Sequence, residues 1–233
     1  MFKHTINNPN KLKITKDNFI VVPFGYTCTS ALICRYANLR KFALPFDWCS
    51  SAYPNKLQKV LENDFRDFIP DVHNKIFDNK YGFQLAHFDK DINRGIETYK
   101  RRIKRFKNIM NEDKQSKKLY FIYVNSNFMK YAKARTKKFN DDKFNEMLEF
   151  EIFKKKNYPN IDYNILCFNF VKENIPQNSN IINIVLQTDK YGLEIPAMKL
   201  HHYCAKIMVD LFKSSYFKNT NNKWIGPQRF NDA

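Results

Sequence analysis

The sequence has little glycine and lacks the usual cofactor-binding motifs. Only 5 of its 233 residues are glycine, and neither a phosphate-binding loop nor a dinucleotide fingerprint is present. The cysteines form no CxxC pair, and no spacing of cysteine and histidine suggests a zinc site. We therefore expect no cofactor and no metal ion.

Long apolar runs are also absent. The first 18 residues, MFKHTINNPNKLKITKDN, are polar, and no apolar stretch approaches the ~20 residues that span a bilayer. The five cysteines are an odd number without an obvious pairing, which favours reduced thiols. We expect a cytoplasmic protein with no membrane partner. Its single domain would cover residues 1–233, with residues 1–17 flexible or peripheral, and nothing in the sequence indicates an oligomeric state.

Positive charge is in excess, with 40 Lys and Arg against 23 Asp and Glu, for a net charge of +17. Such a surface attracts nucleic acid, anionic membranes or acidic substrates. Composition offers another explanation, because AT-rich codons favour the Lys, Asn, Ile and Phe that are abundant here. Nucleic acid is thus one candidate partner, and an acidic substrate would also suit this charge.

Apolar segments typical of buried strands alternate with helical patterns along the chain. We expect strands at residues 19–22, 42–44, 81–85, 119–124, 163–170 and 181–186. We expect helices at residues 30–38, 54–63, 94–110, about 140–153 and 196–211. Strands that are apolar throughout and alternate with helices indicate an α/β fold: a mostly parallel sheet with helices on both faces, in one domain with short insertions.

The stretch from Phe19 to Trp48 carries the main candidate for chemistry. Its apolar run is interrupted by Pro23 and Gly25, and a helix pattern begins just past Cys28. This places Cys28 at the carboxyl end of a strand and at a helix start, where backbone amides stabilise an anion and favour a thiolate. The alternative is that Cys28 is a small buried apolar residue, which is common for free cysteines.

Five strings occur in order along the first half of the chain: GYTC (25–28), LRKFALPFDW (39–48), AHFD around His87, RRIKRF (101–106) and KLYFIYV (118–124). Together they resemble the papain-like cysteine peptidases of undetermined function that occur in bacteria and large DNA viruses, a family whose name is itself a prediction of activity. The resemblance thins after Val124. The chain also departs from the pattern, because Phe88 separates His87 from Asp89.

The resemblance implies a cysteine-dependent hydrolase that acts on a peptide or another acyl substrate. Cys28 would be the nucleophile and His87 the base, with Asp89 or Asp47 orienting the imidazole ring. The backbone amides of Cys28 and Thr29 would form the oxyanion hole. Thiolate attack on a carbonyl would then give a thioester, which is hydrolysed or transferred to an acceptor.

A second arrangement of the site resembles the flavodoxin-like hydrolases that use Ser, Asn and a C-terminal His. Here Cys28 would replace the serine, Asn125 would follow a middle strand, and His201 or His202 would be the base. Those enzymes usually carry an Asp three residues before the His. Met198 and Lys199 occupy the corresponding positions, so we rank this arrangement lower.

Two further functions come from other classes of protein. The helix at residues 94–110 carries a basic face that could follow a phosphate backbone, but we favour an ordinary solvated face, because no aromatic residue is interleaved on the charged side. The candidate polyanion-binding residues on it are Lys100, Arg101, Lys104, Arg105 and Lys107. Arg101 and Arg102 could instead pair with a buried acid such as Asp47. The last possibility is a non-catalytic viral protein, in the virion or host cytoplasm, that retains an enzyme fold.

Overall fold

The computed structural model describes residues 2–9, 18–25, 27–50, 52–69, 79–85, 88–111, 117–124, 137–170, 172, 174–188 and 197–214. Its strands are β1 (Phe2–Ile6), β2 (Phe19–Gly25), β3 (Lys118–Val124), β4 (Tyr163–Asn169) and β5 (Ile181–Thr188). Its helices are α1 (Thr29–Tyr36), α2 (Pro54–Glu62), α3 (Ile92–Asn111), α4 (Lys137–Asn157) and α5 (Ala197–Phe212). Within these residues no helix is both long and apolar enough to cross a membrane.

The five strands form one sheet in the order β1-β5-β4-β3-β2. The pairs β2–β3, β3–β4 and β4–β5 are parallel, and only β1 runs antiparallel to its neighbour. The parallel strands are buried over nearly their whole length, as strands covered on both faces must be. The predicted α/β class with a mostly parallel sheet is confirmed.

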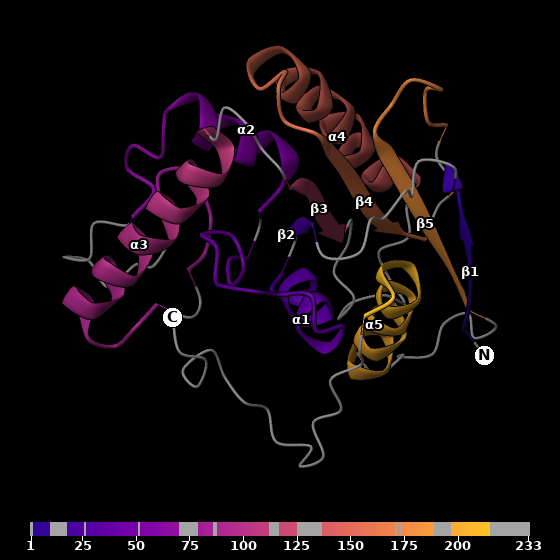
Figure 1. Cartoon of the computed structure of the whole chain (residues 1–233), viewed down its shortest axis with the longest axis horizontal. Helices are drawn as coiled ribbons and strands as arrows, with labels where there is room; N and C mark the ends of the chain where they lie inside the picture. The colour runs from indigo at the N-terminus through magenta and orange to yellow at the C-terminus, as the bar shows by residue number, and fades with distance from the viewer. Residues whose placement is uncertain are drawn as a thin grey trace.

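Helices cover both faces of the sheet (Figure 1). On one face α1 and α5 lie side by side and enclose an apolar core that includes Ile33, Ile122 and Leu200. The other face is covered by α2 and α4, around Val22, Phe121 and Phe150. Because Cys28 immediately precedes α1, the first of these two layers positions the candidate site.

Aromatic rings extend the second core beyond the sheet to α3. Phe46 is the centre of this cluster, with ring centroids 5.4–6.0 Å from those of Phe65, Phe68, Phe83 and Phe106. Two strands expected in this region are wrong. Residues 42–44 form no strand, because the chain turns at once through residues 45–48, and residues 81–85 contribute only an isolated bridge from Gln84 to Ser50.

The sheet has one strand that the sequence did not predict. β1 pairs with β5 from Phe2 opposite Thr188 to Ile6 opposite Ile184. Its central side chains, Lys3, His4 and Thr5, are exposed. As an edge strand it presents polar residues to solvent, so it lacks the apolar pattern by which the other strands are recognised. Residues 10–17, the rest of the segment expected to be flexible or peripheral, lie outside the described residues.

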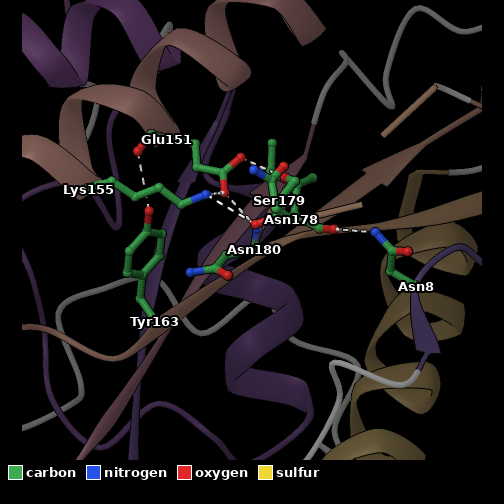
Figure 2. Close-up of polar contacts among 8 residues, drawn as sticks. Asn8, Glu151, Lys155, Tyr163, Asn178, Ser179 and Asn180 are labelled. Carbon is green, nitrogen blue, oxygen red and sulfur yellow. Dashed lines mark hydrogen bonds and ion pairs between the residues drawn. The ribbon is translucent and has the colours of Figure 1, made fainter. Parts of the chain in front are cut away.

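A buried carboxylate on α4 holds the connection between β4 and β5 (Figure 2). Glu151 accepts hydrogen bonds at 2.6 Å from the Ser179 hydroxyl and at 2.6 Å from the Asn180 backbone amide. The ammonium group of Lys155 lies 2.8 Å from Glu151 Oε1 and also donates to the Asn178 carbonyl. These contacts fix the short crossover just before β5 begins.

Candidate functional site

Cys28 lies in the tight turn between β2 and α1. β2 ends at Gly25, whose φ of +150° is a conformation that favours glycine. A side chain would not fit at this position, because its Cβ would lie 3.0 Å from the Val124 carbonyl oxygen. Three residues later Cys28 is the N-cap of α1, and its carbonyl accepts the first helical hydrogen bond from Leu32 at 3.0 Å. The strand, turn and helix expected around Cys28 are all present.

The surroundings of the Cys28 thiol favour its neutral form. Burial raises its pKa above the ordinary value, and a backbone hydrogen bond only partly offsets this effect. In the free protein, the effect of burial on the Cys28 pKa therefore exceeds that of the helix N-terminus. Cys28 is nevertheless half-buried, whereas the four other cysteines are fully buried. It is the cysteine to which a reagent or substrate has access, and its deprotonation calls for a base.

The residues on either side of Cys28 are joined by their hydroxyl groups. Thr27 Oγ1 and Thr29 Oγ1 are 2.7 Å apart, and the backbone N–H of Thr29 donates to Thr27 Oγ1 at 3.3 Å. Thr29 Oγ1 in turn lies 3.2 Å from Nε2 of His201 on α5. Thr29 and His201 are both buried, with exposed fractions of 2% and 5%. A hydrogen-bonded chain thus runs from the Cys28 turn to the neighbouring helix.

His201 is neutral near physiological pH. Burial, with a smaller contribution from the neighbouring His202, lowers the pKa of His201 to about 4. His202 is more exposed and lies beside Tyr36, with ring centroids 4.5 Å apart and the ring planes tilted by 37°. The arrangement that we ranked lower thus contributes one histidine to the surroundings of Cys28, while Asn125 lies outside the described residues.

His87 also lies outside the described residues, but the segment that follows it is anchored to α3. Phe88 stacks on Tyr99 with ring centroids 5.6 Å apart, and its ring lies where a side chain on Gly95 would otherwise be. Asp89 accepts a hydrogen bond from the Asp91 amide and pairs with Arg94 at 3.3 Å. Phe88, the departure from the family pattern, is therefore a core residue, and Asp89 lies just before α3, which begins at Ile92.

Asp47 is fully buried and paired with an arginine. Arg40 Nε donates to Asp47 Oδ2 at 2.6 Å. Burial raises the pKa of Asp47, while the charge of Arg40 and, to a smaller extent, that of Arg102 oppose the shift. Arg101 is exposed and donates to Thr98. The main partner of Asp47 is thus Arg40, which we did not expect, and Arg102 acts on Asp47 through its charge.

The five basic residues predicted to bind a polyanion divide into two groups. Arg105 donates to the Ala43 carbonyl at 2.7 Å, and Lys107 pairs with Asp64 at 2.7 Å, so both hold α3 to neighbouring segments. Three are exposed on the solvent face of α3: Lys100, Arg101 and Lys104. Within the described residues, no group of three or more His, Cys, Asp or Glu side chains is placed to hold a metal ion.

Comparisons with known proteins give one match. Searches of curated proteins and of solved structures found none. The match is to a family model and covers about a quarter of the chain, from the start of β2 past the end of α2. It includes Cys28 and Asp47 and stops before His87 and α3. Residues 19–75 match the family described as "Putative papain-like cysteine peptidase", in agreement with the resemblance of the sequence strings.

Proposed function

We propose that the protein is a cysteine-dependent hydrolase or acyl-transfer enzyme with Cys28 as its nucleophile. The observation that carries this proposal is the position of Cys28. It is the accessible cysteine, it occupies the N-cap of α1 after a parallel strand, and it lies within the segment that matches the peptidase family. The substrate class that this match favours is a peptide.

The reaction would begin with removal of the Cys28 proton. Because burial raises the thiol pKa, a base must take the proton as sulfur attacks the carbonyl carbon, and the resemblance assigns that role to His87. A carbon–sulfur bond forms, the leaving group departs with a proton, and water or another acceptor then cleaves the thioester. The amides of Cys28 and Thr29 would stabilise the oxyanion.

Of the two carboxylates proposed to orient the base, Asp89 suits the role better. Asp47 is enclosed and committed to Arg40, whereas Asp89 has a side chain that is 31% exposed and immediately follows the His87–Phe88 segment. Its partner Arg94 is largely exposed, so this ion pair holds Asp89 weakly.

The pH dependence of iodoacetamide labelling tests the proposal, read cysteine by cysteine by mass spectrometry. If His87 takes the proton as sulfur attacks, Cys28 should react at pH 6–7 faster than a cysteine-containing peptide despite its raised pKa. The peptide thiol, with a pKa of about 8.5, is mostly protonated there and has no such base. His87→Gln should remove this advantage, and His202→Gln should not. Equal rates for Cys28 and the peptide would rule out an activated nucleophile. Comparison with a peptide matters, because the buried cysteines react slowly for lack of access alone.

The net charge of +17 supports a second candidate function, the binding of a polyanion along the solvent face of α3. Lys100, Arg101 and Lys104 are exposed there. Binding of single-stranded or duplex nucleic acid should weaken steeply between 50 and 200 mM salt if phosphate contacts provide the affinity. Affinity that does not change over this range, or that survives the Lys100→Gln, Arg101→Gln, Lys104→Gln triple change, would exclude this face.

A further inference from the structure

The hydrogen bond from the Thr29 amide to Thr27 bears on the oxyanion hole. An oxyanion donor must point at the position that the substrate oxygen will occupy. In this structure the Thr29 N–H already has an acceptor, Thr27 Oγ1, at 3.3 Å. One of the two amides proposed for the hole is therefore occupied by an oxygen atom of the protein itself.

Thr27 is held in this position from its other side. The two threonine oxygens are 2.7 Å apart, closer than the amide and its acceptor, and Thr29 Oγ1 continues to His201 Nε2. When Nε2 of neutral His201 accepts, the Thr29 hydroxyl donates to it, the Thr27 hydroxyl donates to Thr29, and Thr27 Oγ1 accepts from the amide. Every hydroxyl proton in the chain is then used once.

The residues of this hydrogen-bonded chain are buried in the core, except for Thr27. Thr29 begins α1, and His201 is buried on α5 between Leu200 and Cys204, in the core that these two helices share. Thr27, in contrast, is half-buried and lies in the turn before the helix. A substrate oxygen that approaches the Thr29 amide would therefore displace the Thr27 hydroxyl and leave the helices in place.

We propose that the Thr27 hydroxyl oxygen accepts the Thr29 N–H at the position that a substrate's carbonyl oxygen would take. The contact between Thr29 and His201 holds the Thr27 hydroxyl there until an acyl substrate displaces it. Thr27, Thr29 and His201 are thus positioning residues, which set the availability of one oxyanion donor. The inference rests on the proposed function, because it assigns the Thr29 amide to the chemistry of Cys28.

Two electrophiles that react with the same sulfur distinguish the oxyanion hole from activation of the thiol. p-Nitrophenyl acetate acylates Cys28: a carbon–sulfur bond forms, the ester carbon–oxygen bond breaks, the thiol proton passes to a base, and p-nitrophenolate leaves. This reaction passes through an oxyanion, whereas iodoacetamide alkylates by direct displacement and does not. The ratio of the two rates at Cys28, each followed by mass spectrometry, therefore reports on the hole.

Thr27→Ala removes the competing acceptor and should raise the acylation-to-alkylation ratio about fivefold, which corresponds to the loss of one competing hydrogen bond. Thr29→Val keeps the amide but removes the hydroxyl that holds Thr27, and should shift the ratio in the same direction by a smaller factor. His201→Leu should follow Thr29→Val. Thr27→Ser retains the acceptor and should restore most of the wild-type ratio, and His202→Leu is the matched control on α5.

The outcomes distinguish this inference from the proposed function. If wild-type Cys28 is acylated but Thr27→Ala and Thr29→Val leave the ratio unchanged or lower it, the inference is wrong and the proposed function stands. If wild-type Cys28 reacts with neither reagent faster than a cysteine peptide, the proposed function fails, and the inference fails with it. Far-UV circular dichroism checks that each variant is folded, and the Thr27 variants keep the test valid if His201→Leu does not fold.

Discussion

Glu151 and Lys154 lie one turn apart on α4, and both are buried, but their surroundings are opposite. The Glu151 carboxylate accepts hydrogen bonds from the Ser179 hydroxyl and the Asn180 amide, and it forms an ion pair with the Lys155 ammonium group. Lys154 is completely enclosed, and its ammonium nitrogen has no hydrogen-bond partner in the described part of the chain. It faces the rings of Phe121, Tyr158 and Tyr163, 4.5–5.9 Å from their centroids.

The difference shows that burial alone does not reveal what a charged residue does. The carboxylate of Glu151 joins α4 to the connection that precedes β5, so its burial contributes to stability. Lys154 has only ring faces, which offset part of the cost of a charged amine, and burial lowers its pKa to about 7. Asp47 lies between these two cases, because Arg40 pairs with its Oδ2 while its buried Oδ1 has no hydrogen-bond partner within the described residues. Because Asp47 is enclosed and committed to Arg40, we look to Asp89 for orientation of the base.

Glu151→Ala should have the largest effect on stability. It leaves the Ser179 hydroxyl and the Asn180 amide without their acceptor in a buried region, and it frees the crossover that precedes β5. We expect the free energy of unfolding to fall by about 3 kcal/mol, measured by urea denaturation. Glu149→Ala, a change at an exposed position on the same helix, is the control. A loss no larger than that of the control would mean that the crossover is held by other contacts.

Lys154→Met should act in the opposite direction. Methionine fills a similar volume and can pack against the same three rings, without an amine to desolvate. We expect the free energy of unfolding at pH 7 to increase by about 2 kcal/mol, measured by the same urea titration. Lys156→Met, at an exposed neighbouring position, should change little. Destabilisation by Lys154→Met would show that the ring faces more than compensate the buried amine.

The stability of the wild-type protein should also depend on pH through Lys154. Its pKa is about 7 in the folded protein and near 10.4 in the unfolded chain, so between these values the unfolded chain binds the additional proton. Stability therefore rises with pH across this window, by at most about 1.4 kcal/mol per pH unit. The measurement is urea unfolding from pH 7 to 9. Lys154→Met should remove the rise, and a rise of equal size in that variant would assign it to other groups.

The sequence predicted the fold class and the position of Cys28 because both depend on local patterns. Buried strands are apolar throughout, and Pro23, Gly25 and the following helix pattern mark a turn. β1 escaped prediction because its exposed Lys3, His4 and Thr5 become a strand only through pairing with β5.

Contacts between distant positions set the surroundings of Cys28. His201 reaches Thr29 across 172 positions of sequence, because α5 packs beside α1 on one face of the sheet. No spacing rule gives that contact, and the missing Asp before His201 argued against it. Pairing of Asp47 with Arg40 likewise depends on how residues 39–48 turn.

Lys155→Met should have the smallest effect, and it sharpens the comparison with Lys154. Lys155 is 43% exposed, and its ion pair with Glu151 is screened by solvent on one side. Glu151 keeps the Ser179 and Asn180 hydrogen bonds when this cation is lost, so the free energy of unfolding should fall by only about 0.5 kcal/mol. Urea titrations at 0.05 and 0.5 M salt check this, because the loss should shrink as salt rises. A loss as large as that of Glu151→Ala would mean that the charge of Lys155, rather than the two hydrogen bonds, keeps the carboxylate buried.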